Sequence, residues 1–345
     1  MNRISLEQKS IIQKQIKESN QIAVISHFNP DGDAVGSLLG FYNYLKKSGK
    51  TIHALLPNEA PEFLHWMPAH NEIIFHSVNT EVAERIVSQA DTIFVLDFNE
   101  PKRVEKFQTA LASAKGFKIM IDHHPMPSPT WDLLISDITS SSTAELVYEV
   151  IEAIDLYEMD KTIATCLLSS IITDTGCFEF NSSNPRTFEI VANLLSYGVE
   201  KDKIIGNIMK SHTEQRMKLQ GYCLYEKMKI LPQYHAAYVA LSSEELKKFN
   251  YKKGDAEGLV DMPLSIKGIN FTVFFTEQTE KIRISFRSRG TFNVNLFARN
   301  HFNGGGHLNA AGGDSFVSLE ETVAKFLSLL PDYTHELNYN PLKFN

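Results

Sequence analysis

The sequence predicts an α/β protein with a parallel-rich N-terminal sheet flanked by helices, a helical linker and a smaller α+β C-terminal domain. Its 345 residues exceed the usual size of a single domain. In the first part of the chain, short apolar runs alternate with helix-like stretches, which is typical of parallel βαβ units. The pattern restarts after residue 228 with a different order of elements. We therefore expect domains at residues 1–198 and 228–345, joined by a helical linker at 199–227.

The N-terminal elements can be placed by their periodicity and by their end signals. The first helix is expected at residues 5–18, before the first strand at 22–26. Further strands are expected at 51–56, 72–76, 92–96, 117–121 and 133–136, and further helices at 34–47, 80–88, 105–114, 144–154, 161–172 and 185–197. Because parallel strands end at one edge of a sheet, polar residues that follow them are expected to meet there.

The C-terminal part follows a long helical stretch at 201–227 that shows no strand pattern and suits a semi-rigid linker. Strands are expected at 235–241, 269–276 and 281–288, and helices near 243–248 and 294–300, with a final helix that ends at Leu329. A glycine triplet, Gly304–Gly306, precedes His307. The sequence contains no internal repeat, and we expect a mixed α+β domain.

The composition limits the class of ligand. The formal net charge is −7, and 43% of the residues are hydrophobic. Long duplex nucleic acid is an unsuitable partner, because its binding requires many basic residues. A small phosphorylated ligand or a very short oligonucleotide needs only a few local charges.

The cysteines and the N-terminus predict the compartment. Cys166, Cys177 and Cys223 fit no zinc spacing, so we expect free thiols in a reducing environment. The first 20 residues have no signal-peptide pattern, and no window reaches the length of a membrane span. We expect a cytoplasmic protein that does not associate with membranes.

Three potential metal ligands follow the first strand. His27 comes just after it, and Asp31 and Asp33 lie on either side of Gly32 at the start of a helix. Taken alone, Asp31-Gly32-Asp33 is equally well explained as a turn with a helix N-cap. We interpret Gly32 as the hinge that lets the two carboxylates diverge.

Similar side chains end three other elements. Asp97 follows one strand, Asp122-His123-His124 follows another, and Asp174 ends a helix. Each alone could be a solvated surface group, but a carboxylate at a helix C-terminus opposes the helix dipole unless a cation compensates it. Carboxylates mixed with imidazoles suit manganese or magnesium better than a closed zinc site. The combined pattern predicts a metal cluster.

At these residues the sequence closely resembles the DHH phosphoesterase family, which is named for the triplet Asp122-His123-His124. The resemblance includes His27-Phe28-Asn29-Pro30-Asp31-Gly32-Asp33-Ala34-Val35-Gly36-Ser37, the lone Asp97, and Thr173-Asp174-Thr175-Gly176. It extends to the C-terminus, where Asn303–His307 with Arg287 upstream is similar to the DHH-associated domain.

The resemblance implies a phosphoesterase that uses two Mn²⁺ ions, with Mg²⁺ or Co²⁺ as other candidates, and a possible homodimer. One ion would be held by His27 and Asp31, and the other by Asp33, His123 and Asp174. Three residues complete the implied catalytic set: Asp97 as the bridging ligand, Asp122 as the partner that orients the histidines, and His124 facing the substrate phosphate or leaving group. A hydroxide between the ions would attack phosphorus.

The C-terminal glycines have a physical interpretation of their own. Gly304, Gly305 and Gly306 would let the backbone approach an anion with N–H groups directed at it, while His307 and Arg287 add a hydrogen bond and a charge. Arg289 is a weaker second candidate. A flexible loop accounts for most lone glycine triplets, so the interpretation as a nucleotide clamp depends on the metal site.

Family members of this size resemble bacterial oligoribonucleases that degrade RNA of two to a few nucleotides and dephosphorylate 3′-phosphoadenosine 5′-phosphate. We expect the same short RNA oligonucleotides and nucleotide phosphates as partners here. Cyclic or linear dinucleotide hydrolysis is the enzymatic alternative, and an exopolyphosphatase-related activity is a further one. A non-catalytic nucleotide sensor is the alternative from another class, and it predicts the loss of at least one metal ligand.

Overall fold

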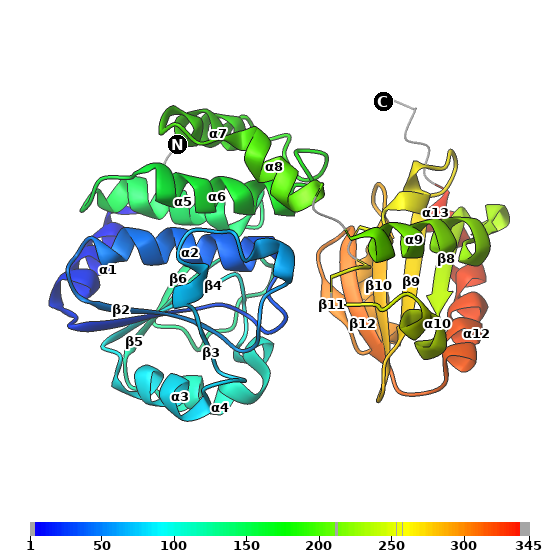
Figure 1. Cartoon of the computed structure of the whole chain (residues 1–345), viewed down its shortest axis with the longest axis horizontal. Helices are drawn as coiled ribbons and strands as arrows, with labels where there is room; N and C mark the ends of the chain where they lie inside the picture. The colour runs from blue at the N-terminus through cyan, green and yellow to red at the C-terminus, as the bar shows by residue number, and fades with distance from the viewer. Residues whose placement is uncertain (1–3, 211–212, 253, 257, 339–345) are drawn as a thin grey trace. The chain divides into compact units, whose positions relative to one another are not determined.

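The computed structural model shows two compact units, Met1–Ser211 and His212–Asn345 (Figure 1). It describes residues 4–210, 213–252, 254–256 and 258–338. The linker expected at 199–227 contains the division between the units, and residues 211 and 212 within it lie outside the described residues. The boundaries at 198 and 228 stay predictions.

The first unit is built on a six-stranded sheet in which every neighbouring pair is parallel. The strand order is β3-β2-β1-β4-β5-β6. The strands are β1 (Gln21–Ile25), β2 (Thr51–Leu56), β3 (Ile74–Phe75), β4 (Thr92–Leu96), β5 (Phe117–Asp122) and β6 (Leu133–Ser136). The order reverses between β1 and β4, and this is where open α/β sheets place their ligands. The predicted parallel sheet is confirmed.

Helices cover both faces of this sheet (Figure 1). One face carries α1 (Leu6–Glu18), α2 (Gly32–Lys46), α5 (Thr143–Ile154) and α6 (Lys161–Asp174), and the other carries α3 (Thr80–Gln89) and α4 (Gln108–Ser113). The helices α7 (Pro185–Ser196) and α8 (Lys201–Met209) pack against α6. Successive residues of β1 enter opposite cores, with Val24 in one and Ile25 in the other. This two-sided burial explains why apolar residues predominate along the strands.

Three glycines four residues apart let α2 approach α6 closely. An added Cβ at Gly32 would lie 2.3 Å from Thr173 Oγ1, at Gly36 2.7 Å from the Cys166 carbonyl oxygen, and at Gly40 2.6 Å from Leu167 Cδ2. At Gly32 and Gly36 a side chain would overlap Thr173 and the backbone of α6, whereas at Gly40 the end of the Leu167 side chain would have to move. Gly32 is thus required by helix packing, which replaces the interpretation of a hinge. The close contact brings the start of α2 beside the end of α6.

The helix expected at 105–114 is shorter than predicted. A 3-10 helix occupies Pro101–Phe107, and α4 begins only at Gln108. Glu105 has a φ of 51°, which an α-helix cannot accommodate. The apolar residues of the segment do recur with helical spacing, but the change of backbone direction at Glu105 divides the segment into a 3-10 helix and a short α-helix.

The second unit contains a mixed six-stranded sheet of order β11-β12-β10-β9-β8-β7. The pair β8–β9 is parallel and the others are antiparallel. The strands are β7 (Lys229–Leu231), β8 (Ala236–Leu241), β9 (Phe271–Glu277), β10 (Ile282–Ser288), β11 (Gly305–Gly306) and β12 (Ala310–Ser315). The strand β12 reads Ala-Ala-Gly-Gly-Asp-Ser and lacks strand-forming residues, so the sequence did not predict it.

The helices of the second unit complete its two cores. They are α9 (Glu214–Tyr222), α10 (Ser243–Lys248), α11 (Val294–His301), α12 (Leu319–Leu329) and α13 (Thr334–Leu337), and a π-helical turn, Cys223–Lys227, follows α9. Phe297 of α11 and Phe326 of α12 pack on the face of the sheet that carries Phe271. Leu219 of α9 and Leu246 of α10 belong to the other core. Among the described residues, none of the helices is long and apolar enough to cross a membrane.

Candidate active site

The structure brings together all the predicted ligands of the first unit. His27 lies just beyond β1, Asp97 directly follows β4, and Asp122 ends β5. Two groups of side chains place one ligand atom each within 4.8 Å of the others: His27, Asp31 and Asp97, and Asp33, His123 and Asp174. A third group, Asp97, Asp122 and His124, shares Asp97 with the first. The cluster therefore lies where the strand order reverses.

His27 is buried and presents one nitrogen to two carboxylates. Its Nδ1 donates to the carbonyl oxygen of Phe28 at 2.9 Å. The Nε2 atom lies 3.3 Å from Asp97 Oδ2 and 4.0 Å from Asp31 Oδ1, and it makes no hydrogen bond within the described part of the chain. Burial, with a contribution from Arg103, lowers the pKa of His27 to about 4. A neutral imidazole thus presents an unused lone pair.

The two aspartates that flank Gly32 have different surroundings. Asp31 is the N-cap of α2, where Oδ1 accepts from the backbone N–H groups of Asp33 and Ala34 at 3.0 Å, and half of its side chain is exposed. Asp33 is buried, and both its oxygens accept hydrogen bonds from the start of α5. The Ser170 hydroxyl of α6 also donates to it. The predicted N-cap is therefore present, but it accounts for Asp31 only.

Asp97 lies between the two ligand groups. Its Oδ2 faces His27, while its Oδ1 lies 3.8 Å from His123 Nε2. Its φ of 64° is left-handed, a conformation that a residue other than glycine adopts at some energetic cost. Burial and then the nearby Asp33 and Asp31 raise the pKa of Asp97 well above its usual range.

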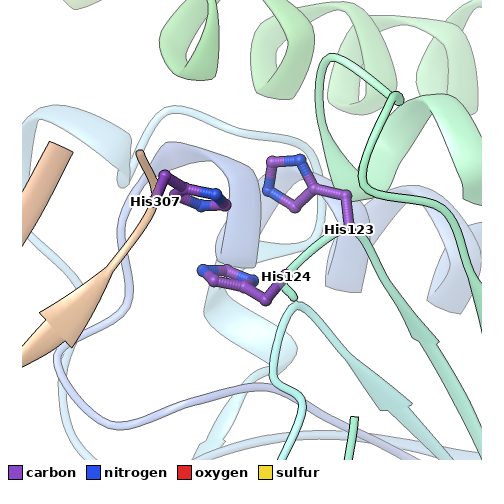
Figure 2. Close-up of side chains that lie close together, drawn as sticks. All are labelled: His123, His124 and His307. Atoms are coloured by element: carbon purple, nitrogen blue, oxygen red, sulfur yellow. The ribbon is translucent and has the colours of Figure 1, made fainter. Parts of the chain in front are cut away.

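His123 and His124 follow β5 with their rings 5.0 Å apart and nearly perpendicular (Figure 2). His123 Nδ1 donates to the Ser140 carbonyl oxygen at 3.3 Å, so its Nε2 faces Asp33 and Asp174 at 3.7 and 3.6 Å. Burial lowers the pKa of His123, but Asp174 and Asp33 outweigh it and the net shift is upward. His307, also labelled in Figure 2, belongs to the second unit.

Asp122 orients His124. The Nδ1 of His124 donates to Asp122 Oδ1 at 2.7 Å, which leaves Nε2 directed away from this carboxylate. Burial disfavours the ionised carboxylate, but the charge and hydrogen bond of His124 prevail and lower the pKa of Asp122. A hydrogen bond of this kind fixes both the tautomer and the ring orientation of a histidine.

Asp174 is the last residue of α6 and precedes a strained turn. Its side chain is 29% exposed, so it is the least buried ligand of its group. Gly176, Cys177 and Phe178 then have φ values of 56°, 59° and 72°, and two of them are not glycine. Consecutive left-handed residues are costly and are typical of functional sites. The turn reverses the chain immediately after the carboxylate.

The chemistry of this cluster fits divalent cations. Five aspartates and three histidines converge at one edge of the sheet, and the pKa of Asp97 is raised by burial and then by the crowding of like charge. His27 Nε2, the ring nitrogen that carries the lone pair, is buried and makes no hydrogen bond in the described residues. Oxygen-rich sites with imidazole nitrogen suit Mn²⁺ or Mg²⁺. Bound cations would relieve the repulsion and use the free lone pair.

Hydroxyl groups next to the ligands are a feature that the sequence does not predict. Thr143 donates to Asp97 through Oγ1 at 2.9 Å, and Ser37 and Ser170 donate to Asp33. The run Thr139–Thr143 is a visible cluster of hydroxyl residues, but by itself it indicates only helix capping. Its contacts with Asp97 and Asp33 join positions 46 and 110 residues apart. Local patterns carry no signal for such contacts.

In the second unit, Arg287 lies on β10 and is held by a carboxylate. Its Nε lies 3.1 Å from Asp261 Oδ1, and its Nη1 donates to the Phe286 carbonyl oxygen. Burial raises the pKa of Asp261 despite the guanidinium beside it. Ala310 of β12 pairs with Arg287, and the backbone N–H of His307 donates to Ala310. These contacts bring Arg287 and His307 to the same part of the unit.

The glycine triplet has a structural role that the sequence did not suggest. The N–H of Gly304 donates to the Ala298 carbonyl oxygen, and that of Gly306 to Asn295 Oδ1. A Cβ at Gly304 would lie 2.1 Å from the Gly312 carbonyl oxygen. These two amides are therefore engaged within the unit, contrary to the expectation that they point at an anion. Arg289 follows β10, where its N–H donates to the Asn270 carbonyl oxygen.

Comparisons with known proteins match both units. Residues 21–171 match the DHH family, N-terminal domain, and residues 232–336 match the DHHA1 domain. The bifunctional oligoribonuclease and PAP phosphatase NrnA of Thermus thermophilus is 30% identical over 84% of this chain and 83% of its own length. The cyclic-di-AMP phosphodiesterase PdeA of Listeria monocytogenes is 27% identical over 93% of this chain but only 49% of its own. The crystal structure of an exopolyphosphatase-related protein from Bacteroides fragilis matches with a TM-score of 0.94 and 40% identity, over 97% of this chain and 99% of that one.

The fold and the matching domains define a hydrolase that acts on phosphoester bonds. The chain belongs to the DHH family, and its second unit contains a DHHA1 domain. The resemblance inferred from the sequence is thereby confirmed.

Proposed function

We propose that this chain is a manganese-dependent phosphoesterase that hydrolyses RNA of two to about five nucleotides to nucleoside monophosphates and dephosphorylates 3′-phosphoadenosine 5′-phosphate. The observation that carries the proposal is the position of Asp97, whose two oxygens face His27 of one ligand group and His123 of the other. The relative named oligoribonuclease and PAP phosphatase supports the substrate class. The net charge of −7 agrees with a short substrate.

In the proposed site, His27, Asp31 and Asp97 would hold one Mn²⁺, and Asp33, His123 and Asp174 the other, with Asp97 shared. When bound, two such ions polarise a phosphoryl oxygen and lower the pKa of a coordinated water. Mg²⁺ or Co²⁺ would suit the same atoms, because supply and geometry decide between these metals.

The protein's own groups would act around these ions. His124, held at Nδ1 by Asp122, would present Nε2 to the substrate phosphate or the leaving oxygen. Asp97, as the carboxylate shared by both groups, would fix the distance between them. We assign this chemistry to the domain at residues 1–198.

The domain at residues 228–345 would recognise the nucleotide, with 199–227 as its linker. Arg287 is oriented by Asp261, and its guanidinium would bind a phosphate or a base. His307 and Arg289 would add a hydrogen bond and a charge. Because the amides of Gly304 and Gly306 are engaged, these two glycines and Gly305 would contribute by letting β11 and its ligand approach closely.

A second candidate is hydrolysis of a cyclic dinucleotide or its linear product. The similarity to the phosphodiesterase PdeA favours it, although this chain spans only about half of that protein. The similarity to the exopolyphosphatase-related protein of Bacteroides fragilis suggests a polyphosphate substrate as a further alternative. A sensor without activity is disfavoured because every matched ligand position holds a competent residue.

A product analysis separates these activities. The protein is incubated with Mn²⁺ and, in parallel, with a linear diribonucleotide, a five-nucleotide RNA, 3′-phosphoadenosine 5′-phosphate, a cyclic dinucleotide and polyphosphate. We expect nucleoside monophosphates from the two short RNAs and loss of the 3′-phosphate from the third substrate. Turnover of the cyclic dinucleotide or polyphosphate alone would refute the proposal, as would no turnover at all.

A further inference from the structure

A buried turn between β6 and α5 touches three of the candidate ligands. We call residues Ser140–Thr143 the hydroxyl turn, and all four are fully buried. The carbonyl oxygen of Ser140 accepts from His123 Nδ1. The N–H of Thr143 donates to Asp33 Oδ2 at 2.8 Å. Its Oγ1 donates to Asp97 Oδ1 at 2.9 Å. The ligands it contacts come from three different elements.

Thr143 is the part of this turn that binds two carboxylates at once. Asp33 and Asp97 are both buried, and burying two carboxylates side by side without hydrogen-bond donors is costly. A residue that donates one hydrogen bond to each lowers that cost and fixes the spacing of the two groups. The contact with Asp33 is reinforced by Ala144, whose N–H donates to Oδ1 at 3.2 Å in the first turn of α5.

Helix capping does not explain the Thr143 hydroxyl. The N-cap of α5 is Ser142, whose hydroxyl accepts from the N–H of Glu145. Thr143 is the first residue of the helix, and at a fully buried position a valine would fill the same volume without a polar group. The Thr143 hydroxyl does not cap the helix but donates to Asp97. Asp97 Oδ1 is the oxygen on the side of His123, whereas Oδ2 faces His27.

A buried carboxylate holds the turn in place. Glu145 Oε2 accepts from the N–H and the hydroxyl of Ser141 at 2.9 and 2.6 Å. It also accepts from Thr187 Oγ1 of α7 at 3.1 Å. Thr187 is as fully buried as Thr143 and also donates to a buried carboxylate, but its acceptor is not a candidate ligand. Thr187 therefore offers a matched control.

We propose that Thr143 is a positioning residue whose hydroxyl orients Asp97 as the carboxylate shared by the two ligand groups. The proposal rests on the two-ion site proposed above. Residues that donate hydrogen bonds to metal ligands, without touching the metal themselves, typically affect metal affinity as well as activity. We expect removal of the hydroxyl to lower the affinity for Mn²⁺ clearly and to lower the free energy of unfolding of the metal-free protein only slightly.

The test measures Mn²⁺ binding by isothermal titration calorimetry without substrate, together with urea unfolding of the metal-free proteins. Thr143→Val removes the donor at constant volume, Thr143→Ser keeps it, and Thr187→Val removes the matched hydroxyl. We expect Thr143→Val to bind at least one ion about 10–100-fold more weakly. Thr143→Ser and Thr187→Val are expected to bind Mn²⁺ as the unmodified protein does.

Three outcomes would overturn the proposal. Unchanged Mn²⁺ affinity in a folded Thr143→Val protein would remove the positioning role and leave the proposed function intact. An equal loss in Thr187→Val would show that Mn²⁺ affinity depends on the network that holds the turn and not on the Thr143–Asp97 hydrogen bond in particular. Failure of the unmodified protein to bind Mn²⁺ would refute the proposed two-ion site together with this inference. If Thr143→Val does not fold, Thr143→Ala is measured against Thr143→Ser by the same criteria.

Discussion

Gly32 lies so close to Thr173 that any side chain at position 32 would overlap the threonine hydroxyl. This contact links the first turn of α2, which carries Asp33, to the last turn of α6, which carries Asp174. An added Cβ would fall 2.3 Å from Thr173 Oγ1. The spacing of two candidate ligands therefore depends on a residue that binds nothing itself.

We expect Gly32→Ala to lower the free energy of unfolding by about 1–3 kcal/mol, because overpacking forces the helices apart. Mn²⁺ affinity is expected to fall as well. Gly206 lies inside α8 with open space around it, so Gly206→Ala is the matched control and is expected to stabilise the protein by about 0.5–1 kcal/mol. Urea unfolding of both variants measures the contrast. Equal stabilities would show that α2 and α6 do not require the close contact.

A second prediction concerns Asp174 and the response to metal. Mn²⁺ that binds only the folded state stabilises it by about 2.7 kcal/mol at a hundredfold excess over Kd. The unmodified protein is expected to gain several degrees in Tm on Mn²⁺ addition and to lose them with chelator. Asp174→Asn is expected to show a much smaller gain. Asp202, which is 94% exposed in the same unit, provides the control Asp202→Asn. A full gain in Asp174→Asn would exclude Asp174 as a ligand.

His70, which is not one of the candidate ligands, makes the stability of the fold depend on pH. Burial, with a contribution from His65, lowers its pKa from 6.5 to about 4. Between these values the unfolded chain binds a proton that the folded chain does not, so stability falls as the pH drops from 6.5 towards 4. Partial exposure limits the effect to roughly 1–2 kcal/mol. His70→Phe, which retains a ring beside His65 and Phe75, is expected to flatten this slope in chelator-treated protein. An identical slope in both proteins would refute the assignment.

Glu245 makes a second pH-dependent contribution to stability, in the second unit and in a more acidic range. Burial disfavours its charge, but Lys227, Tyr222 and the Ser242 N–H outweigh it and lower the pKa from 4.5 to about 2. The stabilisation is complete above pH 4.5 and is lost as the pH falls towards 2. Glu245→Gln is expected to cost about 1–3 kcal/mol at neutral pH. The exposed Glu244 on the same helix gives the control Glu244→Gln, and equal urea midpoints would contradict the prediction.

The sequence predicted that the candidate ligands would lie together, and it did so for a physical reason. His27, Asp97 and His123 each follow a mainly apolar strand, and parallel strands all end at one edge. Their convergence follows from the βαβ pattern alone. The structure then separates Asp31, an exposed N-cap, from the buried Asp33, and this difference is not visible in a three-residue motif.

Other features depend on contacts that no local pattern contains. The hydroxyl of Thr143 reaches Asp97 across the sheet edge, and the amides of Gly304 and Gly306 are engaged by α11. The strand β12 forms because β10 offers it a partner, since its own residues have weak strand propensity. The glycine spacing of α2 was present in the sequence, and it indicates close helix packing once the partner α6 is known.

The central claim is that the two ligand groups hold two ions with Asp97 between them. Anomalous diffraction at the manganese edge, from crystals grown with Mn²⁺, locates the ions directly. We predict two peaks, one bounded by His27, Asp31 and Asp97 and the other by Asp33, His123, Asp174 and Asp97. The absence of manganese from these side chains, or a single ion held by Asp97, Asp122 and His124, would contradict the account.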